Sequence, residues 1–296
     1  MQRWSSLLGA ASLLAGCASL QGYEISYPDA LAKAGFPSPV IEVAAGSHHA
    51  YLLVDTGAGT HTLARWFVDS AGLKSSPSRV KLRDSTGHLL AVDQVEAGLR
   101  LAGTDRSLTG IVADFPAEFA EHELAGLLSP QLLAPPGQSV VLDEVARRMR
   151  IESFDEALVE TGASRIGEAR ICAEETAVRN RIYLVPVKVG TQTAFMELDS
   201  GANRTALRAD SKAARSLSGR AAAGNTVGVT GTQLTSEVAT TQVAFAGAAT
   251  SLPVRIVPGD IAVCEADGLL GQDFLQHCVL VLGEDRIAAR CAISAR

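Results

Sequence analysis

LLVDTGAGTHTL, residues 52–63, ends an apolar run in an aspartate and follows it at once with a threonine and a glycine. The apolar residues 50–54 predict a buried strand, because a short continuous apolar run before turn residues is typical of one. Asp55 then stands on a tight turn, for which Gly57 supplies backbone freedom that other residues lack. Backbone N–H groups and the Thr56 hydroxyl can hydrogen-bond its side chain. The stretch therefore predicts a carboxylate held on a turn at the end of a buried strand.

The same pattern occurs a second time. MELDSGANRTAL, residues 196–207, places Asp199, Ser200 and Gly201 at an offset of 144 residues from the first set (199 − 55). The same offset aligns five other pairs: Gly46 with Gly190, Ala50 with Ala194, Tyr51 with Phe195, Ala58 with Ala202, and Leu63 with Leu207. Self-similarity at a fixed distance is the signature of an internal repeat. The chain is therefore predicted to be a duplication in which each half supplies one aspartate.

The two motifs resemble the aspartic peptidases, specifically the retropepsin-like branch with its D-[TS]-G-A signature. The resemblance extends to a second element of that family, an apolar-apolar-glycine turn that packs beside each aspartate. This turn is Leu269-Leu270-Gly271 in the second half and, in weakened form, Leu127-Leu128-Ser129 in the first. The resemblance implies a mostly β fold in which two similar lobes with a few short helices face each other across a cleft.

The resemblance also implies an aspartic endopeptidase in which Asp55 and Asp199 share one proton. Two like charges a few ångströms apart cannot both ionise, so one acid activates a water while the other polarises the peptide carbonyl. We expect such an enzyme to be most active below neutral pH, because the singly protonated pair is lost as the pH rises. Six residues are expected to support the pair: Thr56, Gly57, Ser129, Ser200, Gly201 and Gly271.

Two other interpretations remain open. Ser129 in place of glycine favours a binding module that keeps the cleft without the chemistry, because the added side chain would crowd Asp55. The presence of both acids and both flanking hydroxyls argues against such a module. In the other interpretation each half pairs with a second chain, and the duplication is incidental. We expect a monomer, since both aspartate motifs lie in one chain, and an extended protein or peptide as substrate.

Two further turns repeat at the same offset. Residues 84–87 (DSTG) and 229–231 (VTG) place Gly87 and Gly231 144 positions apart (231 − 87). In the family that the chain resembles, this hairpin is the flap over the cleft. The flap of the pepsin branch carries a tyrosine, and neither turn has one. The alternative for each turn is an ordinary surface hairpin.

The sequence lacks the motifs of several other catalytic chemistries. Its six histidines form no HExxH pattern and no cysteine-assisted metal pattern, so we expect no metal site. It contains no GxSxG, P-loop or GxGxxG motif, and we expect no cofactor. A formal net charge of −6 argues against nucleic acid as a partner.

The amino terminus has the features of a lipoprotein signal. Residues 1–16 combine a short basic start with an apolar stretch too short to span a bilayer, and LAGC (14–17) places Cys17 where lipoprotein signals place the lipidated cysteine. The alternative is an ordinary signal peptide cleaved nearby. We expect a lipid-anchored protein on the periplasmic side of the cell envelope, in the outer membrane because no aspartate follows Cys17. Residues 17–39 are then the tether.

The remaining four cysteines predict two disulfides in an oxidising compartment. Cys278 and Cys291 flank a predicted hairpin that would bring them opposite one another, which leaves Cys172 to pair with Cys264. The alternative is four buried free thiols. The charged, glycine-containing segment 152–169 suits a linker, and we expect an N-terminal lobe over 40–161 and a C-terminal lobe over 162–296.

Overall fold

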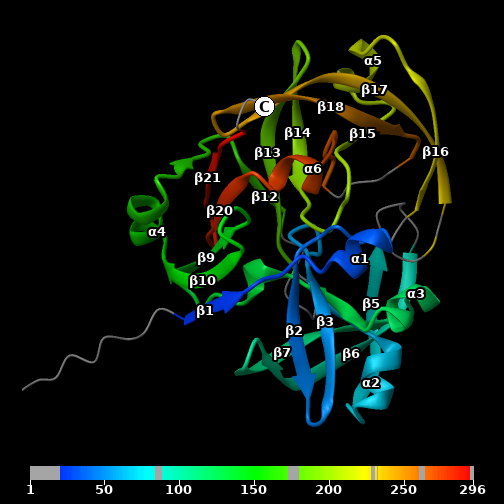
Figure 1. The fold of residues 1–296 in the computed structure, drawn as a ribbon, viewed down its shortest axis with the longest axis vertical. Helices are drawn as coiled ribbons and strands as arrows, with labels where there is room; N and C mark the ends of the chain where they lie inside the picture. Colours follow the sequence, from blue (N-terminus) through cyan, green and yellow to red (C-terminus); the bar gives the residue numbers. More distant parts are fainter. Residues whose placement is uncertain are drawn as a thin grey trace, which may run out of the picture.

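The computed structural model describes residues 21–83, 89–172, 180–227, 231, 233–259 and 264–293. Most of these residues lie in strands that form three sheets, and the helices are short (Figure 1). Cys17 and the first expected flap glycine, Gly87, lie outside the described residues. Within the described part of the chain, no helix is long and apolar enough to cross a membrane.

The first half of the chain forms a seven-stranded sheet in the order β2-β3-β8-β4-β7-β6-β5. Its strands are β2 (Val40–Ala45), β3 (His48–Val54), β4 (His61–Ala64), β5 (Ser75–Arg83), β6 (Leu89–Leu101), β7 (Thr104–Ala113) and β8 (Leu124–Leu128). Because β2 also pairs with β6, the sheet closes on itself as a barrel does. Two helices accompany it, α2 (Arg65–Ser70) and α3 (Ala117–Glu121).

The second half forms an eight-stranded sheet in the order β12-β13-β14-β19-β15-β18-β17-β16. Its strands are β12 (Arg170–Cys172), β13 (Ile182–Val189), β14 (Gln192–Leu198), β15 (Ala206–Arg208), β16 (Ala221–Val227), β17 (Gln233–Phe245), β18 (Ala248–Val257) and β19 (Gly268–Leu270). From β13 onward its order repeats that of the first sheet strand for strand, and β13 also pairs with β17. Helices α5 (Lys212–Ser216) and α6 (Gln272–Leu275) belong to this half. The predicted fold, mostly β with two retropepsin-like lobes, is confirmed.

In both lobes one strand is inserted between the aspartate strand and its successor. β8 runs parallel to β3 and antiparallel to β4, and β19 runs parallel to β14 and antiparallel to β15. The aspartate strands are apolar because both of their faces are covered, and Leu52, Val54, Met196 and Leu198 are fully buried. Parallel pairing brings the ends of β3 and β8 to the same edge of the sheet, where the first aspartate follows.

A third, six-stranded sheet takes strands from both halves, in the order β1-β10-β9-β20-β21-β11. Its strands are β1 (Gln21–Glu24), β9 (Gln138–Asp143), β10 (Arg148–Ser153), β11 (Ser164–Arg165), β20 (Cys278–Leu282) and β21 (Ile287–Cys291). Helix α4 (Phe154–Thr161) begins at the Ser153 cap and ends at Gly162, whose φ of 65° suits glycine. Its Phe154 and Ala157 pack on this sheet. The segment expected to be a plain linker therefore contains a helix and a strand.

Residues 21–39 are part of the fold, whereas the sequence indicated a tether over 17–39. β1 pairs with β10, and Ser26 pairs with the first residue of β2. Helix α1 (Asp29–Lys33) follows. The reason is apolar burial, since Tyr23, Ile25 and Leu31 are at most 4% exposed.

Both predicted disulfides are confirmed. Cys278 and Cys291 are directly opposite in the antiparallel pair of β20 and β21. Cys172 at the end of β12 bonds Cys264, which lies in the loop before β19.

Candidate active site

Each aspartate stands one residue beyond its strand and is fixed there by the neighbouring parallel strand. The Asp55 N–H donates to Leu128 O at 2.9 Å, and the Asp199 N–H donates to Leu270 O at 3.1 Å. We call the aspartate turn and the adjoining apolar turn of one lobe a half-site. The first half-site is centred on Asp55 and the second on Asp199.

The hydroxyls that follow the two acids lock the half-sites together. Thr56 Oγ1 donates to Leu198 O at 2.7 Å and accepts from the Ser200 N–H at 3.0 Å. Ser200 Oγ donates to Val54 O at 2.7 Å and accepts from the Thr56 N–H at 3.1 Å. Both residues are fully buried. This crossed network of four hydrogen bonds joins the ends of the two aspartate strands across the interface between the lobes.

The two carboxyl groups meet, each lying over the glycine of the opposite lobe. A Cβ atom on Gly57 would lie 2.6 Å from Asp199 Cγ, and one on Gly201 would lie 2.4 Å from Asp55 Cγ. Either contact is closer than two carbon atoms can approach, so only glycine fits at these positions. Asp55 is 8% exposed and Asp199 is partly exposed.

The acids interact directly and are electrostatically unequal. Burial raises the pKa of Asp55, but its carboxylate accepts hydrogen bonds from the Gly57 N–H at 2.8 Å and the Ala58 N–H at 3.0 Å, which lower it. Burial raises the pKa of Asp199 well above its ordinary value, and the negative charge of Asp55 raises it further. Asp199 accepts from the Ala202 N–H at 2.8 Å. Asp55 thus accepts from two N–H groups of its own turn and Asp199 from one, an inequality that favours the shared proton on Asp199.

Ser129 lies beside the first half-site, where the second has Gly271. It is fully buried, its N–H donates to His61 Nδ1 at 3.2 Å, and its hydroxyl has no hydrogen-bond partner among the described residues. At Gly271 a Cβ would lie 2.5 Å from the carbonyl carbon of Arg204, not against an aspartate. The equivalent of Arg204 in the first lobe is Thr60, at the same offset of 144. By this equivalence the Cβ of Ser129 faces the main chain near Thr60 rather than the carboxyl group of Asp55.

Several residues of the site were not identified from the sequence. Gln131 is fully buried and donates to the main chain of the Asp55 turn. Ser38 Oγ donates to Gly201 O at 3.1 Å, and Asn203 Nδ2 donates to Gly35 O at 2.6 Å. These contacts join segments far apart in the sequence. The sequence signal for Gln131 was its position, since it is a polar residue two positions after the apolar turn that ends at Ser129.

Gly231, the second expected flap glycine, approaches the opposite lobe. It has a φ of 82°, and a Cβ built on it would lie 3.4 Å from Cγ of Pro116, which precedes α3. The β16–β17 hairpin of the second lobe thus reaches the first lobe beside that helix.

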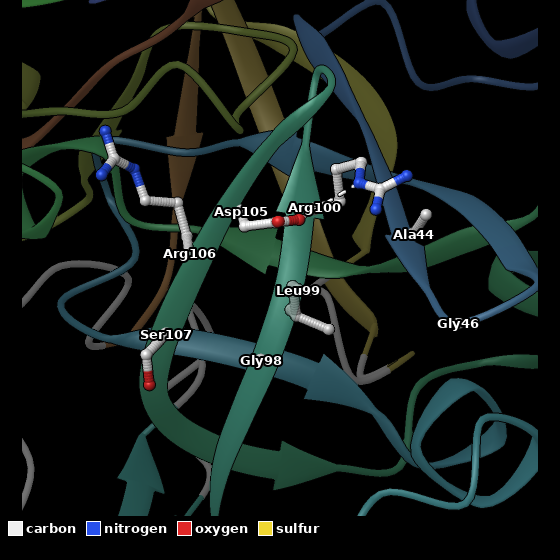
Figure 2. Close-up of a pocket in the computed structure, with 8 residues that line it drawn as sticks. All are labelled: Ala44, Gly46, Gly98, Leu99, Arg100, Asp105, Arg106 and Ser107. Atoms are coloured by element: carbon white, nitrogen blue, oxygen red, sulfur yellow. Dashed lines mark hydrogen bonds and ion pairs between the residues drawn. The ribbon is translucent and has the colours of Figure 1, made fainter.

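The pocket shown in Figure 2 is separate from the aspartates. It measures about 490 Å³ and is lined by residues of β2, β6, β7 and their turns, among them Arg100, Asp105 and Arg106. No residue of either half-site lines it. In the described part of the chain, no group of three His, Cys, Asp or Glu side chains is placed to hold a metal ion.

Comparison with known proteins places a family match on the second half-site. The aspartyl protease family model matches residues 185–274. A search of curated proteins found no match. The matched segment runs from within β13 into α6, and it contains Asp199 and Gly271. This part of the chain is therefore similar to the aspartyl proteases, in the lobe whose glycine turn is intact.

Proposed function

We propose that the protein is an aspartic endopeptidase that hydrolyses peptide bonds with a water activated between Asp55 and Asp199. The observation that carries this proposal is the meeting of the two carboxyl groups, each over the glycine of the opposite lobe. An isolated turn would not need that approach, because a capping aspartate is satisfied by the N–H groups of its own loop.

We assign the roles of the two acids from their unequal hydrogen bonding. Asp55, ionised, takes a proton from the water, whose oxygen attacks the peptide carbon, while the proton on Asp199 polarises the carbonyl oxygen. The tetrahedral intermediate then breaks its C–N bond, and the amine leaves with the proton held by Asp55. Because burial raises the pKa of Asp199, this singly protonated state persists above the pH at which a free aspartate ionises. Activity is lost when the pH rises through the upper pKa of the pair.

The test is substitution of each acid. Asp55→Asn and Asp199→Asn should each abolish cleavage of an unfolded protein substrate, while circular dichroism and thermal unfolding show a folded chain. Either variant retaining full activity would refute a mechanism that needs both acids.

A second candidate is a peptide-binding protein without catalysis. The observation that favours it is Ser129, because the first half-site departs from the family pattern at this buried position. Wild-type protein that binds extended peptides and cuts none of a diverse set, at any pH from 3 to 8, would support this candidate over the peptidase.

We further propose that the enzyme acts as a lipid-anchored monomer on proteins of the cell envelope, on the periplasmic side of the outer membrane. Lipidation would be at Cys17, and β1 begins at Gln21, so only a few residues would separate the membrane from the fold. Proximity would then supply much of the selectivity. Cys17→Ser should release the protein from the membrane fraction, and the released form should sediment as an active monomer.

The lobes proposed for this enzyme are 40–161 and 162–296. The six-stranded sheet, built from both, supports a single chain that keeps its two half-sites together. Activity that falls on dilution would instead indicate an obligate dimer.

A further inference from the structure

Gln131 is a buried side chain that, like Thr56, reaches from the first half-site to the main chain of the second lobe. It lies in the short 3₁₀ turn after β8 (Pro130–Leu132) and is fully buried. Its amide nitrogen lies 3.2 Å from Thr56 O and 3.1 Å from Ala58 O, on both sides of Gly57 in the aspartate turn. The same nitrogen lies 2.8 Å from Arg181 O, just before β13 of the other lobe.

Arg181 completes a closed set of contacts. Its N–H donates to Gly59 O at 3.0 Å, and its Nη1 lies 3.5 Å from Gln131 O. Two residues therefore hold the aspartate turn. The Gln131 amide bonds its Thr56 and Ala58 carbonyls, and the Arg181 N–H bonds Gly59 O. Carbonyls that point to a common donor fix the orientation of the turn, and with it the N–H groups of Gly57 and Ala58, which bond Asp55.

The equivalent residue of the second half-site does something different. Asp273 accepts hydrogen bonds from the N–H of Thr205 at 2.9 Å and from its hydroxyl at 2.7 Å, both within its own lobe. A carboxylate cannot donate to carbonyl groups, whereas the amide of Gln131 can. The difference in side chain therefore converts a contact within one lobe into a contact between lobes.

We infer that Gln131 is a positioning residue of the site, which holds the Asp55 turn in register with the second lobe. The inference rests on the proposed peptidase function only for its kinetic readout. Removing the amide takes away the two N–H donors that these three carbonyl groups share, and it frees the turn that carries Asp55. Misplacement of the Asp55 carboxyl group lowers the rate of the chemical step and leaves substrate binding largely intact.

The test is Gln131→Met, which keeps the length of the side chain and removes its donors. We expect the amides of Gly57 and Ala58 to exchange with solvent about tenfold faster or more, with exchange at Ala202 in the second half-site unchanged. We also expect kcat to fall by about 10- to 100-fold with KM within about twofold. The matched control is Gln138→Met, at an exposed position of β9, which should change neither quantity.

Unchanged exchange at Gly57 and Ala58 would overturn the inference, and so would equal acceleration at Ala202, because that would be general loosening of the fold. If Gln131→Met does not fold, Gln131→Asn, which keeps the amide but shortens its reach, is measured in the same way and should show the same local acceleration. Amide exchange needs no enzymatic activity. It therefore decides the role of Gln131 even if the protein cuts no peptide.

Discussion

The two half-sites have the same main-chain geometry and different supporting side chains. In each, the aspartate N–H donates to the parallel neighbour, and each carboxyl group lies over the other's glycine. The support differs at three positions, His61, Ser129 and Gln131 in the first half-site against Thr205, Gly271 and Asp273 in the second.

One pair of equivalent hydrogen bonds shows how unlike side chains support the two half-sites. The N–H of Ser129 donates to His61 Nδ1 at 3.2 Å, and the N–H of Gly271 donates to Thr205 Oγ1 at 3.2 Å. The same backbone donor is satisfied at the same distance by unlike acceptors. The groups at the interface of the lobes are alike in both halves, whereas the residues behind them differ and have in common only that they satisfy buried main-chain groups.

The largest effect is expected where the halves are most alike. Gly57→Ala and Gly201→Ala should each lower kcat/KM by about 10²-fold or more, because the added methyl group displaces the opposite aspartate. Peptide cleavage by the purified variants measures the loss. Gly98→Ala is the control, since a Cβ there meets no atom within 4 Å. A large loss in only one of the two variants would contradict the symmetric approach of the acids.

The next effect concerns the anchor of the second half-site. Gln272 Nε2 donates to the Tyr27 hydroxyl at 2.9 Å and to Glu144 Oε2 at 3.2 Å, and the Tyr27 hydroxyl also donates to Glu144. Burial raises the pKa of Glu144 from 4.5 to about 8, partly opposed by the hydrogen bond from Gln272. The folded protein thus keeps a proton that the unfolded chain releases near pH 4.5.

Because the folded protein binds this proton more tightly than the unfolded chain does, the free energy of unfolding falls as the pH rises. This group stabilises the fold fully below pH 4.5, and the stabilisation is lost as the pH rises toward about 8, at up to roughly 1.4 kcal/mol per pH unit. Glu144→Gln should flatten the fall in the free energy of unfolding between pH 5 and 8, measured by urea denaturation. Glu24→Gln, exposed on β1, should leave the slope unchanged. An unchanged slope in Glu144→Gln would mean that the buried carboxyl is ionised at neutral pH.

A smaller effect tests the crossed network. Thr56→Val and Ser200→Ala each remove a hydroxyl that makes two buried hydrogen bonds. We expect each to lower the free energy of unfolding by about 1–3 kcal/mol. The double variant should cost less than the sum, because the two hydroxyls share one network. Additive losses in urea denaturation would show that the two hydroxyls act independently.

The sequence predicted the acids, hydroxyls and glycines that meet between the lobes. It did not predict the residues that support them from behind. The constant offset identified which acids, hydroxyls and glycines meet, because a duplicated strand and turn fold in the same way in each lobe. It did not predict the Gln131 contact with Arg181 or the pairing of β1, which contains Tyr23, with β10. Those contacts join distant segments through residues that no periodic pattern marks, so only the three-dimensional arrangement identifies them. The helix within 152–169 was missed because its charged, glycine-flanked composition is also typical of linkers.

The smallest expected effect is at Ser129, where the two half-sites differ most plainly in sequence. Its buried hydroxyl has no partner among the described residues, and such a group costs about 1–3 kcal/mol. Ser129→Ala should therefore raise the free energy of unfolding by about 1 kcal/mol with little change in kcat. Gly271→Ala at the equivalent position should be destabilising, because its Cβ would lie 2.5 Å from the carbonyl carbon of Arg204. Because Ser129→Ala keeps a Cβ and Gly271→Ala adds one, stabilisation by the first and destabilisation by the second would show that the first lobe accommodates a Cβ where the second does not. Destabilisation by Ser129→Ala would instead mean that the hydroxyl makes a needed hydrogen bond.

A large rise in kcat in Ser129→Gly would mean that the serine restrains catalysis, and that the difference between the half-sites is functional rather than tolerated.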